Sequence, residues 1–506
     1  MKKIYLLPII FLFFCLLYSG ESQAKIRDKE HPWYIPNSEY TYVRNAQQYI
    51  KKQKFDKAEA EISKVSDPTL KKVYRWILYT NASQEVSYKE ISSFVRQNKN
   101  WPEMEKLLKR AEEAMDTSLS EEEIIKWFAE KRSWSGQIRF REPMTARGKI
   151  ILGEALLNSQ NAKIDKSKAR EFIRSGWIEG NFSEKEEADL LNKYGKILRI
   201  KDHVSRIDRL LWDERVTPAL RLMDFADEDH KKLFKARIGL IQNSFGIDKL
   251  INAVPQKLQA DQGLIFDRVR WRSQRSKSDE MSQLLKAVPA NPKYPERWWK
   301  YKAKQIREYL EERDYKSAYS MASFSGLTEG VDFADAEWLS GWISLQFLND
   351  PKNAYRHFYN LYQGVVTPLS LSRGAYWAGR AAEKNSNPDI AQSWYFAATK
   401  YPTTFYGQLA ARKLGKKTLE FPKQPNFTDG DVNNYHTNEL VKAGFIAHNL
   451  DRSSDAKKFF KAAIESAKSL GEVRLITDLG AQIERPDYGI DAAKEVSKSG
   501  LILTDA

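Results

Sequence analysis

Residues 373–410 have the sequence RGAYWAGRAAEKNSNPDIAQSWYFAATKYPTTFYGQLA, in which clustered aromatic side chains are separated by small ones. Such a cluster is typical of either a binding site or a repeated packing unit. Its spacing is helical, because small or aromatic residues recur at positions i, i+3, i+4 and i+7 of two segments. These positions are Ala375, Ala378, Gly379 and Ala382, then Ala391, Trp394, Tyr395 and Ala398. The polar turn EKNSNPD lies between them, so the stretch predicts a helical hairpin.

The same pattern recurs upstream and downstream. In EWLSGWISLQFLNDPKNAYRHFYNLY, Gly341 precedes Gly379 by 38 residues, and Ala354 precedes Ala391 by 37. In KAGFIAHNLDRSSDAKKFFKAAIES, Gly444 precedes an Ala-x-x-Phe-Phe segment. This period is typical of tetratricopeptide-like helical hairpins, which stack into a superhelix because a single hairpin cannot bury its apolar face. Repetition at this period favours packing over ligand binding for the aromatic cluster.

The rest of the chain is also predicted to be helical. Two Ser-x-x-Glu pairs have the spacing of capping boxes, namely Ser120 with Glu123 and Ser183 with Glu186. No alternating pattern of polar and apolar residues indicates a strand. We therefore predict an all-α fold, with a tetratricopeptide-like helical-hairpin superhelix, a ring or a solenoid, over residues 25–400. A smaller helical linker domain is predicted over residues 401–506.

The first 24 residues have the pattern of a secretory signal peptide. Lys2 and Lys3 precede the apolar run IYLLPIIFLFFCLLY, and the small residues Ser22 and Ala24 follow at the spacing that signal peptidase recognises. We expect export to the periplasm, with cleavage between Ala24 and Lys25. The alternative is an uncleaved N-terminal anchor, but the run is short for a bilayer span. After cleavage we expect no stable membrane span.

Charge and cysteine content narrow the set of partners. Cys15, the only cysteine, lies in the apolar run, so the mature chain is expected to form no disulfide and no thiolate metal site. Lys and Arg number 82 against 67 Asp and Glu, a net charge of +15. In a periplasm the available polyanions are cell-wall peptide carboxylates and lipid headgroups. The basic stretch DRVRWRSQRSKSDE is therefore interpreted as a solvated helix face with Trp271 in the core, and no nucleic-acid partner is predicted.

Motifs for metal, cofactor or nucleophilic chemistry are missing from the sequence. The six histidines lack paired helical spacing, and no phosphate-binding glycine loop or Gly-x-Ser-x-Gly elbow occurs. His357 is interpreted as a core residue, and the acidic run Glu121–Glu123 as the first turn of a helix, where acids favour the macrodipole. Trp298 and Trp299 are expected to face the core and a neighbouring helix rather than to form a sugar platform. We predict no metal site, no cofactor and no catalytic residue.

Several blocks resemble the soluble lytic murein transglycosylase family in its periplasmic, superhelical form. From about Trp101 onward they cover most of the chain in the family's order: REPMTARGKIILGEALL, GWIEGNFSEKEEADLLNKYG, DRLLWDERVTPALRLM, LIFDRVRW, ERWWKYKA, ADAEWLSGWISLQFLNDP and RGAYWAGRAAE…WYFAATKYPTTFYGQLA. The resemblance implies a ring-like helical domain and a linker domain that starts near residues 401–407. It also implies a C-terminal lysozyme-like domain, whose single glutamate cleaves murein glycan strands to 1,6-anhydromuramoyl ends.

We expect that catalytic domain to be absent from this chain. The family's Glu-Ser-x-Phe and Gly-Leu-Met-Gln signature is missing, because Glu465-Ser466 is followed by AKSLGEVRLITDLG, and the sequence stops at SGLILTDA. Two functions stay open. The chain is the non-catalytic part of a truncated or split lytic transglycosylase that binds peptidoglycan glycan strands or a catalytic-domain polypeptide. Alternatively, it is a periplasmic helical-repeat scaffold for another cell-wall protein, with no murein role.

Overall fold

The computed structural model describes residues 32–81, 86–116, 118–130, 139–161, 165–275, 278–416, 426–498 and 502–503. The predicted signal peptide, with its cleavage site at Ala24 and Lys25, lies outside these residues. Across the described ranges the chain forms 27 α-helices and two short 3-10 helices, and its β-type pairing is one isolated bridge between Ala129 and Phe140. The predicted all-α fold is confirmed. No helix in these ranges is long and apolar enough to cross a membrane.

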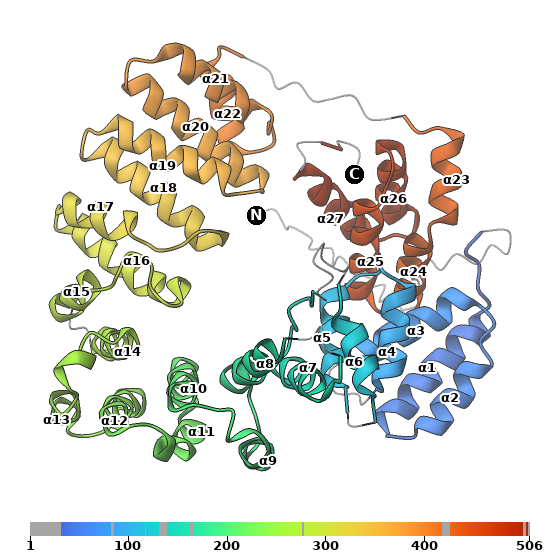
Figure 1. The fold of residues 1–506 in the computed structure, drawn as a ribbon. Helices are drawn as coiled ribbons and strands as arrows, with labels where there is room; N and C mark the ends of the chain where they lie inside the picture. Colours follow the sequence, from blue (N-terminus) through green and yellow to red (C-terminus); the bar gives the residue numbers. More distant parts are fainter. Residues whose placement is uncertain are drawn as a thin grey trace, which may run out of the picture. The chain divides into compact units, whose positions relative to one another are not determined.

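The first part of the chain contains α1 (Asn37–Lys51), α2 (Phe55–Ser63), α3 (Pro68–Thr80), α4 (Tyr88–Gln97), α5 (Met104–Glu113), α6 (Glu121–Phe128), α7 (Ala146–Asn158), α8 (Lys166–Glu179) and α9 (Glu184–Tyr194). The middle part contains α10 (Ile200–Trp212), α11 (Val216–Arg221), α12 (Glu228–Gln242), α13 (Ile247–Asn252), α14 (Gln262–Ser273), α15 (Ser278–Lys286), α16 (Pro295–Glu311), α17 (Tyr315–Ser323) and α18 (Gly330–Gln346). The last part contains α19 (Pro351–Gln363), α20 (Pro368–Lys384), α21 (Pro388–Thr399), α22 (Phe405–Lys413), α23 (Asp429–Thr437), α24 (Glu439–Asn449), α25 (Ser453–Glu465), α26 (Leu470–Gln482) and α27 (Pro486–Ser497). Consecutive helices pack as hairpins, as the run from α16 to α22 shows in Figure 1.

Each hairpin of the predicted repeat is closed by a glycine under an aromatic ring. A Cβ on Gly341 would lie 2.7 Å from the ring of Phe358, one on Gly379 would lie 2.7 Å from Tyr395, and one on Gly444 would lie 2.5 Å from Phe460. Because real Cβ atoms do not approach that closely, the second helix can pack only against a glycine here. Most aromatic side chains of residues 373–410 thus pack in one core cluster, as their periodicity predicts, whereas Phe396 and Phe405 are exposed.

The two aromatic residues of the pair Trp394 and Tyr395 have different neighbours, and the ring over Gly379 is that of Tyr395. Trp394 packs against the preceding hairpin, where the centroids of its ring and the Tyr362 ring are 5.0 Å apart. Adjacent residues on a helix point about 100° apart, so only one ring of an aromatic pair enters its own hairpin.

Contacts divide the chain into two compact units. Of the described residues, the first unit contains 32–74 and 426–495, and the second contains those between 75 and 416 together with 496–498 and 502–503. In the first unit Arg44 donates a 2.6 Å hydrogen bond to the carbonyl oxygen of Asn449. In the second unit α22 packs on α20 and α21. This division does not coincide with the predicted domains 25–400 and 401–506, which stay a prediction.

Candidate functional site: a groove around helix α7

Helix α7 lies very close to α8 in the second unit because both helices carry glycine at the contact. A Cβ on Gly153 would lie 2.7 Å from the carbonyl oxygen of Ala169, and one on Gly176 would lie 2.7 Å from that of Ala146. These neighbours are backbone atoms, which cannot rotate aside as a side chain does. The two helices therefore form a close antiparallel pair, and α7 is the floor of the groove described below.

A buried carboxylate fixes the N-terminus of α7. Glu112, fully buried on α5, accepts hydrogen bonds from the backbone N–H (2.9 Å) and the hydroxyl (3.1 Å) of Thr145. It also pairs with Arg141 at 2.8 Å. Thr145 in turn accepts a hydrogen bond from the N–H of Gly148 at 2.9 Å and so caps the helix. The negative charge of Glu112 is favourable at the N-terminus of α7 because of the helix macrodipole. The same contacts connect α5 to α7.

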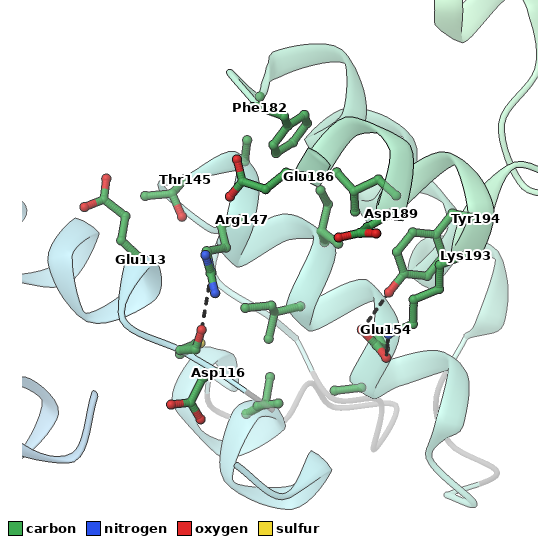
Figure 2. A pocket seen from close by; sticks show the side chains of 18 of the residues that line it. Glu113, Asp116, Thr145, Arg147, Glu154, Phe182, Glu186, Asp189, Lys193 and Tyr194 are labelled. Atoms are coloured by element: carbon green, nitrogen blue, oxygen red, sulfur yellow. Dashed lines mark hydrogen bonds and ion pairs between the residues drawn. The ribbon is translucent and has the colours of Figure 1, made fainter. Parts of the chain in front are cut away.

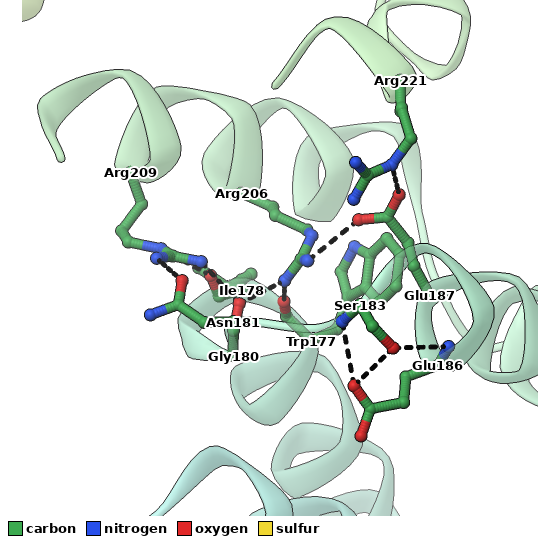
Figure 3. Close-up of polar contacts among 10 residues, drawn as sticks. All are labelled: Trp177, Ile178, Gly180, Asn181, Ser183, Glu186, Glu187, Arg206, Arg209 and Arg221. Atoms are coloured by element: carbon green, nitrogen blue, oxygen red, sulfur yellow. Dashed lines mark hydrogen bonds and ion pairs between the residues drawn. The ribbon is translucent and has the colours of Figure 1, made fainter. Parts of the chain in front are cut away.

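Two arginines of α10 hold the turn between α8 and α9 (Figure 3). Arg206 donates hydrogen bonds to the carbonyl oxygens of Trp177 and Gly180. Arg209 donates to the carbonyl oxygens of Ile178 (3.1 Å) and Gly180 (2.6 Å). The last carbonyls of a helix have no partner within the helix, so these bonds satisfy the end of α8. The turn is thereby tied to the next helix of the array.

Arg206 is itself fully buried and paired. It donates to Glu187 at 3.1 Å, and the other oxygen of Glu187 accepts from Arg221 at 2.9 Å. Its guanidinium lies over the rings of Trp177 and Phe182, 4.4 and 4.9 Å from their centroids. Burial lowers the pKa of Arg206 to about 10, and Glu187 opposes that effect, so the arginine is charged at neutral pH. A buried charge with this many partners has little freedom, and the turn that it holds is pre-organised.

A groove of about 1060 Å³ lies over α7, with α5 and α6 on one side and the α8–α9 turn and α9 on the other (Figure 2). Its apolar lining includes Leu119, Ile124, Ile150, Ile151, Phe182 and Leu190. Pockets for small molecules typically have volumes of about 300–1,000 Å³. The groove is slightly larger than that range, and its size suits a segment of polymer.

The groove is negatively charged although the chain as a whole is positively charged. Hydrogen bonds from Ser118 lower the pKa of Asp116, and hydrogen bonds from Ser183 lower the pKa of Glu186, so both carboxylates are ionised at neutral pH. In total seven carboxylates and three cationic side chains line it: Glu113, Asp116, Glu121, Glu154, Glu179, Glu186 and Asp189, with Lys109, Arg147 and Lys193.

Some of these charges are paired within the protein. Glu154 accepts a 2.6 Å hydrogen bond from the hydroxyl of Tyr194 and also pairs with Lys193. Glu179 pairs with Lys149 at 2.8 Å. These pairs reduce the net negative charge of the groove.

Three carboxylates at the rim are not paired in this way. Glu113, Glu121 and Asp189 are exposed, and among the described residues no basic side chain lies within ion-pair distance of them. Arg147 donates a 3.3 Å hydrogen bond to the carbonyl oxygen of Met115. Its charge also contributes to the lowered pKa of Asp116, from one wall, and of Glu186, from the other. The groove thus has one central cation between two acidic walls.

Residues that the sequence analysis singled out take structural roles. Both predicted capping boxes are confirmed, at Ser120 with Glu123 and at Ser183 with Glu186. His357 is 3% exposed, as predicted for a core residue, and its Nδ1 lies 2.9 Å from Glu337. Trp298 and Trp299 are both buried in one core cluster, so neither ring is a platform for a sugar.

The remaining candidate residues also take structural positions. Trp271 packs against the core, and the guanidinium carbon of Arg275 lies over its ring, 3.9 Å from the ring centroid. Glu465 is the exposed last residue of α25, 3.8 Å from Lys461. In the part of the chain that the structure describes, no group of three or more His, Cys, Asp or Glu is arranged to hold a metal. Of the residues singled out, Glu121 and Glu186 line the groove.

The groove was not predicted from the sequence. Its acids are distributed from Glu113 to Asp189 on several helices, and each one by itself has the pattern of a solvated helix face. A usable signal was Gly153 with Gly176, in two of the family-like blocks, since glycines within neighbouring helices mark a close pair. That signal indicates the floor but does not identify the walls.

No protein-family model matches the sequence, and no curated protein matches it. Solved structures do match the fold. The 70-kDa soluble lytic transglycosylase of Escherichia coli matches with a TM-score of 0.50 and 12% identity, over 92% of this chain and 72% of that one. The lytic transglycosylase Slt of Pseudomonas aeruginosa, an inactive mutant, matches with a TM-score of 0.55 and 13% identity, over 90% of this chain and 70% of that one. At these identities the matches show a shared helical fold over most of the chain.

Proposed function

We propose that the chain is the non-catalytic, superhelical portion of a lytic-transglycosylase-like protein of the periplasm. It acts as a scaffold that binds murein glycan strands or a catalytic-domain polypeptide. The observation that carries this proposal is the extent of the fold similarity, which spans nine-tenths of the chain rather than a few hairpins. The family-like blocks, which occur in the family's order, support the same assignment.

The proposal includes export, with cleavage between Ala24 and Lys25. It also includes the absence of murein cleavage by this chain. A lytic transglycosylase needs a positioned glutamic acid, and loss of such a proton donor lowers the catalytic rate by a factor of roughly 10² to 10⁴. Glu465 does not meet this need, because it is exposed at the end of a helix beside Lys461.

Murein sacculi provide the test. The purified chain is expected to co-sediment with sacculi and to release no 1,6-anhydromuropeptides, measured by mass spectrometry with an active lytic transglycosylase as positive control. Release of these products would overturn the non-catalytic assignment, and Glu465→Gln and Glu123→Gln variants would then identify the acid. Failure to co-sediment would remove murein as the ligand.

A second function is favoured by the acidity of the groove. Murein peptides are themselves carboxylates, so seven acidic side chains in a concave surface disfavour them there. A helical-repeat scaffold for a protein partner, with no murein role, is consistent with that charge.

A further inference from the structure

The groove around α7 has a chemistry that selects among possible partners. We propose that it binds an extended, positively charged polypeptide segment with interspersed apolar side chains, contributed by a protein partner. This inference rests on the proposed scaffold function and names the kind of partner that the scaffold holds at this site.

Charge complementarity is the first argument for such a segment. Glu113 and Glu121 on one wall and Asp189 on the other are exposed and lack a basic partner among the described residues. Lysine or arginine side chains of a bound segment would supply the missing partners. Because both walls carry such acids, a linear segment that lies along α7 is contacted from two sides. A carboxylate-bearing ligand would be repelled by both walls.

The apolar lining supplies the second argument. Ile151 and Leu190 are only partly buried, and together with Phe182 they expose apolar surface inside the groove. A purely cationic ligand would leave this surface in water, whereas alternating apolar side chains would cover it. Arg147 and Asn158, which also line the groove, carry donors that suit the backbone carbonyls of an extended segment.

Rigidity of the walls is the third argument. The turn on one side is held by Arg206 and Arg209 through the carbonyls at the end of α8 (Figure 3). On the other side Glu112 fixes α5 against the start of α7. A groove whose walls are held before binding loses little conformational entropy when it takes a ligand.

Fluorescence anisotropy with a labelled model peptide tests the proposal. The probe is a short peptide of alternating lysine and leucine, compared with glutamate–leucine and lysine–serine peptides of equal length. We expect the lysine–leucine peptide to bind most tightly and its affinity to fall as salt is added. The triple variant Glu113→Gln, Glu121→Gln, Asp189→Asn should bind it on the order of tenfold more weakly.

A matched control neutralises three exposed carboxylates of another helix, with Glu296→Gln, Glu311→Gln and Glu312→Gln around α16. Glu296 and Glu311 have the same helical positions as Glu121 and Glu113, at a first turn and at a last residue. The control should bind like the wild type, and circular dichroism should show that all variants are folded.

Three results would overturn the proposal: equal binding by the groove variant and the wild type, an equal loss in the control variant, or tighter binding of the glutamate–leucine peptide. The sacculus assay separates this inference from the proposed function. If the chain binds sacculi but not the peptide, the proposed peptide partner of the groove is refuted, whereas the proposed scaffold function stands. Peptide binding without sacculus binding would support the groove while removing murein from the function.

Discussion

At the scale of single residues, the sites most sensitive to substitution are those where a small or neutral side chain is required by its neighbours. Gly379 is one, because Tyr395 occupies the space where a Cβ would project. Leucine at this position should overpack the α20–α21 hairpin and lower the free energy of unfolding by about 1–3 kcal/mol. Urea denaturation measures this, with Gln392→Leu on the exposed face of α21 as control. Equal midpoints for both variants would mean that the hairpin relaxes around the new side chain.

His203 is a residue at which pH matters. It is 6% exposed between the rings of Trp177 and Phe225, and burial lowers its pKa below the ordinary value of 6.5. In the unfolded chain the imidazole binds a proton at higher pH than in the folded chain. The contribution of the neutral His203 imidazole to the free energy of unfolding is therefore complete above about pH 6.5. It is lost as pH falls toward the folded pKa, by up to about 1.4 kcal/mol per pH unit.

The His203→Leu variant isolates this contribution. Its free energy of unfolding should change less than that of the wild type between about pH 7.5 and about pH 5.5. The other histidines are common to both proteins, so their effects cancel in the comparison. An identical pH dependence would show that His203 does not contribute.

At the scale of elements, helix ends position the walls of the groove. Arg206 satisfies carbonyls of the α8–α9 turn and is paired with Glu187. Arg206→Met should destabilise the protein by roughly 3 kcal/mol, because it leaves buried polar groups without partners. Adding Glu187→Gln should recover part of that loss, since it removes the buried charge. Hydrogen exchange of residues 178–183 measures the loosening of the turn, and unchanged protection there would contradict this role.

At the scale of the whole molecule, charge is distributed unevenly. The chain carries +15, whereas the groove has an excess of carboxylates. We therefore expect the sacculus binding proposed above to arise from surface outside the groove and to weaken with salt, since exposed charges are screened within about 10 Å at 0.1 M. The groove variant should then bind sacculi as well as the wild type does. Weaker binding by that variant would place murein in the groove.

The helical class and the hairpin packing could be predicted from local sequence patterns. Gly341, Gly379 and Gly444 precede their aromatic partners Phe358, Tyr395 and Phe460 by 17, 16 and 16 residues, and that spacing follows from the geometry of one helix against the next. Capping boxes were equally readable, because Ser120 and Glu123 interact within a single turn. Such features depend on residues that are near one another in the chain.

Contacts between segments that are distant in the chain could not be predicted in this way. Arg44 and Asn449 are more than 400 residues apart, and no local pattern predicts their hydrogen bond. The groove likewise needs Glu113 and Asp189 on opposite sides of α7, a placement set by the Gly153 and Gly176 contacts and by Arg206. Hydrophobic periodicity specifies which face of a helix is buried, but not which helix covers it. That choice depends on side-chain complementarity between elements, and therefore the groove became visible only in the folded chain.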